Sequence, residues 1–196
     1  MSYRGFWTSK GRPSERGIKL DAQAALQCVL SKIDLSNTRV VIWGQSIGAG
    51  VATTALATHL ETETDCRKAA VVSGLILETP FVNLRSMLVA LYPQKFLPYR
   101  YLYPFLRSTW DSQDALQRVA AAPQPRRPKV LILQAGSDEI VPAGQAEILK
   151  CICTEGGLDA KLVPIKGALH TEIMAKQGGR EAAAQFLKTL ADRKHI

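Results

Sequence analysis

Apolar residues occur along the chain in two patterns, as short continuous runs and as longer stretches in which they recur every three or four positions. The continuous runs predict strands that are buried on both faces, as in a parallel sheet. These runs lie at 39–43, 71–77, 129–134 and 161–165. The helical spacing predicts helices at 14–31, 47–60, 143–151 and 181–191, with a polar loop at 61–68. Strands and helices therefore alternate, which predicts an α/β fold with a mostly parallel sheet flanked by helices.

The segment at about 80–113 interrupts this alternation. It is rich in proline, and seven of the thirteen aromatic residues of the chain lie between Tyr92 and Trp110. Such a segment between two core strands predicts a lid inserted over a site, and its aromatic side chains favour a substrate with an apolar portion such as an acyl chain. The same side chains would also pack the lid onto the body, and the two roles do not exclude each other. We expect residues 1–196 to form a single domain with this insertion.

Composition narrows the class of protein. Hydrophobic residues make up 46% of the chain, and no repeat or low-complexity tract is present, so a packed core is expected. No apolar run is long enough to span a membrane, and the first twenty residues are basic without an apolar core. We therefore expect neither an anchor nor a signal peptide in this chain, and an intracellular location. Cys151 and Cys153 lack the spacing of a zinc site, so reduced thiols, no metal and no cofactor are expected.

The net charge of +8 raises the alternative of a nucleic-acid-binding protein. The basic residues are scattered, with small clusters only at 126–129 and 193–194, and no nucleic-acid-binding motif accompanies them. A solvated basic surface is favoured, with weak peripheral contact to an anionic membrane as a lesser alternative. We expect no nucleic-acid partner, and the sequence does not specify the oligomeric state.

The residues Gly44-Gln45-Ser46-Ile47-Gly48 directly follow the predicted strand at 39–43 and open a helix of small residues. This arrangement predicts a nucleophile elbow, a sharp strand-to-helix turn that raises a serine hydroxyl above the edge of a sheet. Gly44 and Gly48 are expected because the turn is tight and because the strand and helix backbones approach closely. An ordinary strand–turn–helix with an exposed serine is the alternative interpretation.

A serine hydroxyl is a weak nucleophile at neutral pH and needs a neighbouring base. Histidine suits this role because it accepts and returns a proton near pH 7. The chain has three histidines: His59 lies two or more helical turns beyond Ser46, His195 lies in a charged tail, and His170 lies in a loop after the strand at 161–165. Only His170 is expected at the sheet edge where Ser46 emerges, and it is the predicted base.

A buried carboxylate would hold such a histidine in the correct tautomer and stabilise its cation. Asp138 follows the strand at 129–134 within a short turn, and Val141-Pro142 stiffens the loop behind it, so Asp138 is the predicted acid. Glu78, at the end of an earlier strand, is the competing candidate. The backbone N–H of Ile47 is the predicted donor to the oxyanion. No second donor is identified.

These motifs resemble the α/β-hydrolase superfamily, in which the triad residues follow the order Ser, Asp, His. More narrowly, the chain is similar to the membrane-associated group related to the fungal bud-emergence protein and its animal α/β-hydrolase-domain relatives. The similarity implies hydrolysis of an ester or a thioester, on a lipid or on a lipidated protein. It covers nearly the whole chain and is carried by residues 2–6, 9–11, 13–17, 20–26 and 77–81, the elbow, and the loops of Asp138 and His170.

The chain also departs from this group. Trp7 stands where the group has a glycine, and only one short strand, around 2–4, is predicted before the first helix. By analogy, the first three strands, the histidine-glycine oxyanion loop and the membrane anchor of the group are expected to be absent. Because the third strand lies between the fourth and the fifth in that fold, the strand at 39–43 is expected to be an unpaired apolar edge. We therefore expect either a truncated form or an incomplete gene model, and an isolated chain that is poorly stable and weakly active.

The leading hypothesis is a serine esterase or thioesterase that acts through an acyl-enzyme, with a small-molecule, lipid or acyl-protein substrate. A non-catalytic interaction or polarity protein with the same fold is the second hypothesis, because the triad residues can persist without a working oxyanion hole. An inactive truncated form belongs to this second class. A basic nucleic-acid-binding protein comes third.

Overall fold

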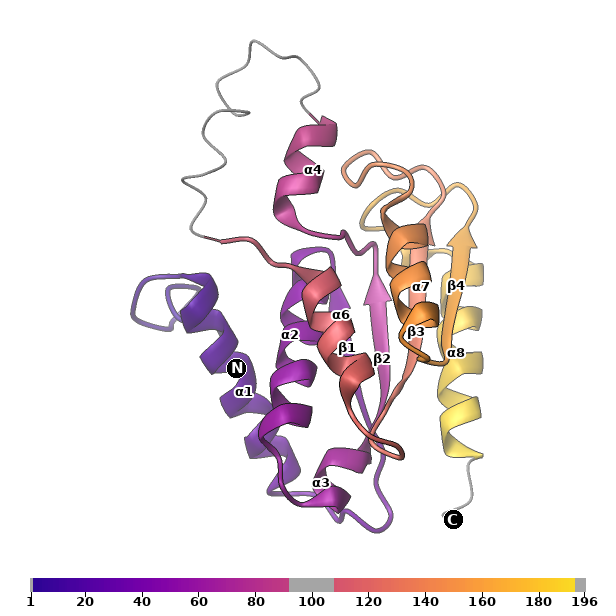
Figure 1. The fold of residues 1–196 in the computed structure, drawn as a ribbon. Helices are drawn as coiled ribbons and strands as arrows, with labels where there is room; N and C mark the ends of the chain where they lie inside the picture. The colour runs from indigo at the N-terminus through magenta and orange to yellow at the C-terminus, as the bar shows by residue number, and fades with distance from the viewer. Residues whose placement is uncertain (1, 92–107, 193–196) are drawn as a thin grey trace.

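The computed structural model describes residues 2–91 and 108–192 of the chain (Figure 1). Its centre is a sheet of four parallel strands in the order β1-β2-β3-β4. The strands are β1 (Val40–Gln45), β2 (Val72–Glu78), β3 (Lys129–Ala135) and β4 (Ala160–Ile165). All four predicted strands are therefore confirmed to within two residues. Because the strands are parallel, their carboxyl ends all lie at the same end of the sheet (Figure 1).

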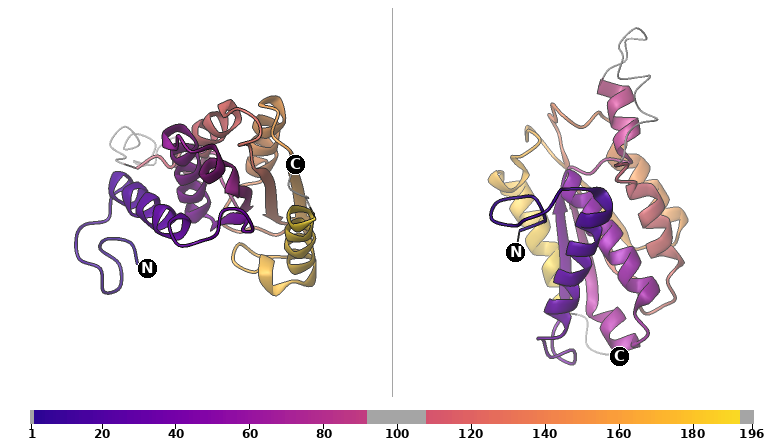
Figure 2. Two further views of the ribbon diagram at one scale, coloured as in Figure 1. Left: turned by 90° about the horizontal axis from the view of Figure 1, so that it is seen from below. Right: turned by 90° about the vertical axis from the view of Figure 1, so that its left-hand side faces the viewer.

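Helices cover both faces of the sheet, as the alternating pattern predicts. They are α1 (Glu15–Leu30), α2 (Ile47–Thr62), α3 (Cys66–Val71), α4 (Leu84–Leu91), α6 (Ser112–Ala121), α7 (Gln145–Glu155) and α8 (Gln177–Ala191), with a short 3-10 helix at Ile173–Ala175. Figure 2 shows α2, α6 and α7 on one face and α8 on the other, while α1 packs on the outside of α2. This is the three-layer arrangement that buried parallel strands require.

The core follows the alternation of side chains along the strands. Leu75 and Leu77 of β2 belong to the cluster that also contains Leu56 of α2 and Leu116 of α6. The intervening Ile76 lies in the second cluster, with residues of α8 such as Phe186. Successive side chains along a strand point to opposite faces of the sheet. Glu78, two residues after Ile76, therefore lies on the face of the sheet that α8 covers.

Several predicted boundaries are wrong, for local reasons. The loop at 61–68 contains the start of α3, which Asp65 caps by accepting a hydrogen bond from the Arg67 N–H (2.9 Å). Helix α6 was not predicted because its short apolar face follows the aromatic segment directly, and Asp111 caps it. The strand expected around 2–4 is absent from the described residues, where this stretch forms turns. The central part of the predicted lid, 92–107, lies outside the described residues.

Strand β1 forms one edge of the sheet. Within the described ranges it pairs with β2 alone, and Trp43 on this strand is 41% exposed. The prediction of an unpaired apolar edge is therefore confirmed. An exposed strand of this kind leaves backbone hydrogen-bonding groups open to pairing with another chain, which favours aggregation.

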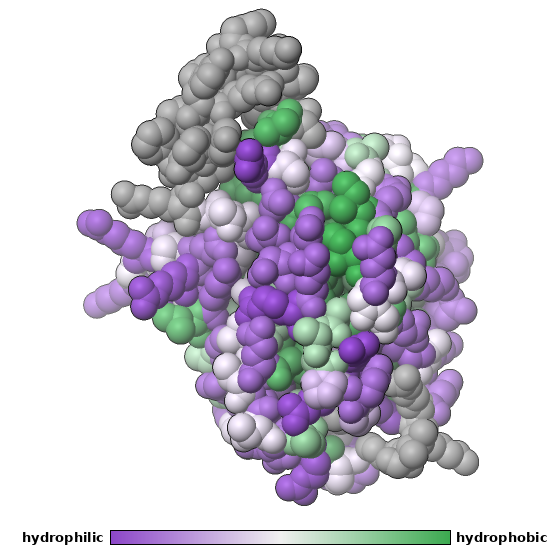
Figure 3. Space-filling view, viewed as in Figure 1, coloured by the Kyte–Doolittle hydropathy of each residue, from purple (hydrophilic) through white to green (hydrophobic). Residues whose placement is uncertain are grey.

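The surface is mostly hydrophilic on the face seen in Figure 3, with a hydrophobic patch near the upper end of α7 and below α4. Exposed apolar side chains on these two helices include Ile148 of α7 (46% exposed) and Val89 of α4 (47%). Of the seven aromatics predicted to pack a lid, Trp110 is the one in a described range. It is 3% exposed and packs with Phe81, Val51 and Val141.

Candidate active site

Ser46 occupies the turn between β1 and α2 in a strained backbone conformation. Its φ and ψ angles are 53° and −122°, a region that residues other than glycine rarely adopt. The Ser46 N–H donates to the carbonyl of Glu78 on the neighbouring strand (2.8 Å), and the Ser46 carbonyl accepts from Ala49 in the first turn of α2 (2.9 Å). The surrounding hydrogen bonds thus hold a strain of about 1–3 kcal/mol, which is typical of functional turns.

The Ser46 hydroxyl is not used to cap the helix that it precedes. Serine is one of the best N-cap residues because its oxygen usually accepts a hydrogen bond from the first turn. At α2 no such side-chain bond forms. The first N–H groups of a helix, here beginning with Ile47, also have no carbonyl partner within the helix. The elbow therefore presents a free hydroxyl next to backbone donors, which is what nucleophilic attack and oxyanion binding need.

The two elbow glycines differ in their surroundings. A Cβ on Gly44 would lie 2.1 Å from the carbonyl oxygen of Gly48 and 2.7 Å from the Cα of Ala49. A Cβ on Gly48 would meet no atom within 4 Å outside its own stretch of helix. Close approach of the two backbones therefore accounts for a glycine at position 44, whereas a side chain at position 48 would have space.

Asp138 and His170 are brought together by the loops that follow β3 and β4. The His170 Nδ1 lies 3.0 Å from Oδ1 and 3.1 Å from Oδ2 of Asp138. The side chain of His170 is 5% exposed and that of Asp138 is 10% exposed. The two loops are joined by a backbone hydrogen bond from Ser137 to Ala168 (2.9 Å), which fixes their relative position. A buried carboxylate at Nδ1 leaves Nε2 of the ring available to act as a base.

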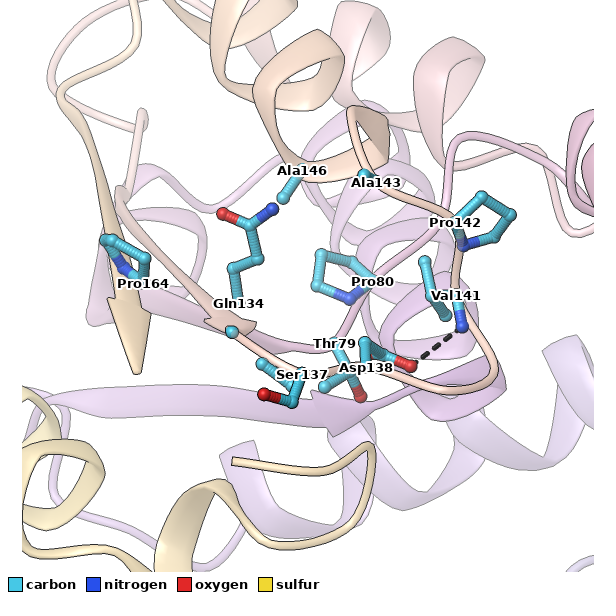
Figure 4. A pocket seen from close by; sticks show the side chains of 12 residues that line it. Thr79, Pro80, Gln134, Ser137, Asp138, Val141, Pro142, Ala143, Ala146 and Pro164 are labelled. Carbon is cyan, nitrogen blue, oxygen red and sulfur yellow. Dashed lines mark hydrogen bonds between the residues drawn. The ribbon is translucent and has the colours of Figure 1, made fainter. Parts of the chain in front are cut away.

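The Asp138 carboxylate is itself held in place. Its Oδ1 accepts hydrogen bonds from the backbone N–H groups of Ile140 (2.9 Å) and Val141 (2.8 Å). Figure 4 shows the second of these bonds as a dashed line. These two bonds hold the carboxylate in the orientation in which it contacts the histidine ring.

The other histidines do not compete for this place. His59 is 3% exposed within α2 and its Nε2 lies 3.2 Å from the carbonyl of Lys68, which makes it a structural residue. His195 lies outside the described residues. The structure does not join the third member of the predicted triad to the other two, because no hydrogen bond links the Ser46 hydroxyl to His170 in the described part of the chain. Such contacts are often long before substrate binds.

Glu78, the competing acid, has partners of its own. Its carboxylate accepts hydrogen bonds from Trp43 Nε1 (3.1 Å) and Gln45 Nε2 (3.1 Å), both on β1. Burial raises the pKa of this carboxyl, against the opposing effects of those two bonds and of the charge on His170. Trp43 and Gln45 are not predictable from sequence as partners of Glu78, because their contact with it depends on the register of β1 and β2, in which Gln45 lies beside Glu78.

A cavity of about 350 Å³ lies next to Asp138, where β2, β3 and β4 end below α7. Figure 4 shows Pro80, Val141, Ala143 and Ala146 around it. The lining combines apolar and polar groups in nearly equal measure. Its buried polar member is Thr79, whose φ is 45° and whose hydroxyl has no hydrogen-bond partner among the described residues.

The described ranges contain no cluster of three or more histidine, cysteine, aspartate or glutamate side chains placed to hold a metal ion. They also contain no helix with the length and apolar content needed to cross a bilayer.

The chain has curated relatives of similar sequence. It is 31% identical to the protein bem46 of Schizosaccharomyces pombe over 187 aligned residues. The alignment covers 95% of this chain and 56% of that protein. It is 30% identical over 206 residues to the α/β-hydrolase domain-containing protein WAV2 of Arabidopsis thaliana, in an alignment that covers 99% of this chain and 61% of that protein. The lysophosphatidylserine lipase ABHD12 of Danio rerio is 36% identical over 149 residues, in an alignment that covers 72% of this chain and 35% of the lipase. The chain matches no protein-family model.

The chain belongs to the α/β-hydrolase superfamily. It spans 56% and 61% of the length of the first two relatives named above. Solved structures agree on the fold. An α/β-hydrolase from Vibrio vulnificus superposes with a TM-score of 0.68 over 96% of this chain and 60% of the other, at 18% identity. An esterase from Pyrobaculum calidifontis superposes with a TM-score of 0.60 over 91% of this chain and 61% of the esterase chain, at 19% identity.

Proposed function

We propose that this α/β-hydrolase chain is a serine hydrolase that cleaves a carboxylic ester or thioester through an acyl-enzyme. In this proposal Ser46 is the nucleophile, His170 the general base and Asp138 the acid that orients the base. The observation that carries it is the buried hydrogen bond between Asp138 and His170 (3.0 Å), at the same edge of the sheet as a strained serine whose hydroxyl is free. A base oriented by a carboxylate is what serine needs to become nucleophilic.

The reaction would proceed in two steps. The Ser46 oxygen attacks the carbonyl carbon of the substrate while its proton moves to Nε2 of His170, and Asp138 stabilises the resulting imidazolium. The proton then passes to the leaving alcohol or thiol, which departs as the acyl group stays on Ser46. Water, deprotonated by the same ring, releases the acid and restores the serine. The N–H of Ile47 at the start of α2 donates to the oxyanion in both steps.

The substrate class is proposed from two lines of support. Relatives of the chain include a protein named lysophosphatidylserine lipase, and the solved structures of the same fold include esterases. The apolar part of the cavity beside Asp138, formed by Pro80, Val141 and Ala146, has room for an apolar group of a substrate. We therefore place lipid esters and acylated proteins ahead of small polar esters.

Labelling with a fluorophosphonate probe tests this proposal. The probe phosphonylates an activated serine, so wild type should label and Ser46→Ala should not. Ser137→Ala is the matched control, because Ser137 is more exposed than Ser46 and lies next to Asp138. Labelling lost equally in both variants, or no labelling of a folded wild-type chain, would contradict the proposal. Circular dichroism on each sample excludes loss by unfolding.

A non-catalytic interaction protein is the second candidate, and two observations favour it. The described residues provide no bond between Ser46 and His170, and no second oxyanion donor is identified among them. This candidate predicts that Ser46→Ala binds partners like wild type and that wild type shows no turnover of esters. Turnover that disappears in Ser46→Ala would reject it.

We also propose a peripheral contact with anionic membranes. The loop before α1 exposes Phe6 (52%) and Trp7 (92%), close in sequence to Lys10 and Arg12. Aromatic residues favour the membrane–water interface, and basic residues are attracted to anionic lipid. An intracellular location and the lack of a nucleic-acid partner remain predictions of the sequence.

A further inference from the structure

A second cavity, of about 540 Å³, lies between the loop before α1 and the side of that helix. Figure 2 shows this loop projecting from the body of the molecule beside α1. The loop contributes three basic side chains to the lining, those of Arg4, Lys10 and Arg12, and α1 contributes one acidic side chain, that of Asp21. The cavity shares no lining residue with the one in the candidate active site, and the proposed reaction does not use it.

Hydrogen bonds within the loop give it a defined shape. The Gly5 N–H donates to the carbonyls of Ser9 (3.2 Å) and Lys10 (3.3 Å). The hydroxyl groups of Ser2 and Ser9 are hydrogen-bonded to each other at 2.6 Å. Gly5 has a φ of 77°, and a Cβ at this position would lie 2.5 Å from Cδ of Pro13. The loop is therefore folded back on itself, and this fold brings its basic side chains to one cavity.

Arg4 joins the loop to α1. Its Nη2 donates to Oδ1 of Asp21 (2.6 Å), and its Nε lies 3.0 Å from both carboxylate oxygens. The backbone N–H of Arg4 also donates to Oδ2 of Asp21 (2.9 Å). Among the described residues that line the cavity, Asp21 is the acidic one, and Arg4 binds both of its oxygens. The charges of these two residues therefore compensate each other.

Lys10 and Arg12 are the other two charged residues of the lining. Neither side chain forms an ion pair or a hydrogen bond within residues 2–91 and 108–192. The cavity therefore carries two positive charges that no carboxylate compensates. A guanidinium can donate two parallel hydrogen bonds to a phosphate, and a lysine adds a compact positive charge. A phosphate monoester, which carries nearly two negative charges at pH 7, matches this pair.

The same loop exposes two aromatic side chains. Phe6 is 52% exposed and Trp7 is 92% exposed. Trp7 also has a φ of 50°, a conformation that is rare for a bulky residue and costs about 1–3 kcal/mol. Aromatic rings of this kind are favoured at the interface between a membrane and water. Because the aromatic residues and the basic cavity belong to one short loop, a ligand with an anionic head group and an apolar surface around it fits both.

We propose that this cavity binds the phosphate monoester head group of an anionic lipid through Lys10 and Arg12, while Phe6 and Trp7 enter the surrounding membrane interface. The inference rests on the membrane contact proposed above and gives that contact a specific binding site. Negative charge alone would attract the scattered basic residues of the chain to any anionic surface. The cavity instead predicts a preference for phosphate over another anionic group of equal charge.

The test uses phosphatidylcholine vesicles that contain phosphatidic acid or, at equal surface charge, oleic acid. Sedimentation should show that wild type binds the phosphatidic acid vesicles more tightly. The double variant Lys10→Gln/Arg12→Gln should bind them about 30-fold more weakly, as expected when two basic residues near an anionic surface are lost. Both residues are exposed, so the variant should fold. The matched control Lys32→Gln/Lys188→Gln removes the same charge outside the cavity and should bind like wild type.

Glycerol 3-phosphate, the soluble head group of phosphatidic acid, tests the site without a membrane. It should shift the backbone amide NMR signals of residues 9–12 in wild type but not in Lys10→Gln/Arg12→Gln. Equal binding to the two kinds of vesicle, or equal losses in the two double variants, would keep the membrane contact and overturn the phosphate site. Binding of glycerol 3-phosphate without binding to phosphatidic acid vesicles would overturn the lipid as the ligand. None of these readouts requires ester hydrolysis, so failure of the hydrolase proposal would be seen separately, as absence of fluorophosphonate labelling.

Discussion

The close approach of strand and helix at the elbow gives a sharp prediction about two glycines. Gly44→Ala places a methyl group 2.1 Å from the Gly48 oxygen and 2.5 Å from its carbonyl carbon, whereas an ordinary contact is 3.4–4 Å. The atoms in the way are backbone atoms, so no side chain can rotate to relieve the clash. Gly48→Ala adds the same methyl group to the same turn and meets nothing within 4 Å. The pair therefore separates steric strain from the simple loss of glycine.

The magnitudes follow from these contacts. Forcing β1 and α2 apart should cost about 3 kcal/mol or more in the free energy of unfolding, the upper part of the range for overpacking. Gly48→Ala should instead stabilise α2 by about 0.5–1 kcal/mol, because alanine loses less backbone entropy than glycine in a helix. For a chain of this length, about 3 kcal/mol corresponds to a decrease in Tm of about 6–12 °C.

Thermal and urea unfolding, followed by far-ultraviolet circular dichroism, measure both effects. We expect Gly44→Ala to unfold at lower temperature and lower urea concentration than wild type, and to lose fluorophosphonate labelling because the turn that carries Ser46 is displaced. Gly48→Ala should be slightly more stable than wild type and should keep its labelling. Equal destabilisation by the two substitutions, or a Gly44→Ala protein as stable as wild type, would refute the steric argument.

Three further predictions concern other parts of the molecule. Burial raises the pKa of Glu15, but bonds from Lys19 and from the backbone at Thr109 and Trp110 lower it further, to a net value below the usual range. Glu15→Gln should therefore unfold more easily at pH 7. The difference from wild type should shrink as the pH falls below about 4.5 and vanish below the lowered pKa of folded Glu15, where wild type also loses the charge. Burial raises the pKa of Cys153 to about 11, so a thiol reagent should modify it only after denaturation. The exposed thiols, which should react at once in the native protein, are Cys28, Cys66 and Cys151. Replacing both Phe6 and Trp7 by serine should reduce sedimentation with phosphatidylserine vesicles, and unchanged binding would reject the proposed membrane contact.

The strands were predictable because each is a continuous apolar run. Such a run is expected in a strand whose two faces are both covered by helices. Helices α1 and α7 were predictable because their apolar residues recur at helical spacing, and α2 because a series of small residues follows the elbow directly. Helix α3 was missed because it lies among charged residues, and α6 because the aromatic segment before it obscures where a new helix begins. Capping residues such as Asp65 and Asp111 were the available signal.

The loops of the candidate site were predicted by a simple rule, that the carboxyl ends of parallel strands meet at one edge. This rule places Asp138 and His170 near each other, and the hydrogen bond between them agrees with it. The environment of Glu78 could not be obtained in this way. Its contacts with Trp43 and Gln45 depend on the exact register between two strands, and a shift of one residue would turn the carboxylate to the other face.

The formation of an acyl-enzyme on Ser46 tests the proposed function most directly. The chain is mixed with p-nitrophenyl acetate, quenched in acid within the first turnover, digested and analysed by mass spectrometry. We predict an acetyl group on the peptide that contains Ser46 in wild type, and none on that peptide in His170→Ala, whose serine has lost its base. Acetylation of another residue, or release of nitrophenol that leaves Ser46 unmodified in wild type, would contradict the assignment of Ser46 as the nucleophile.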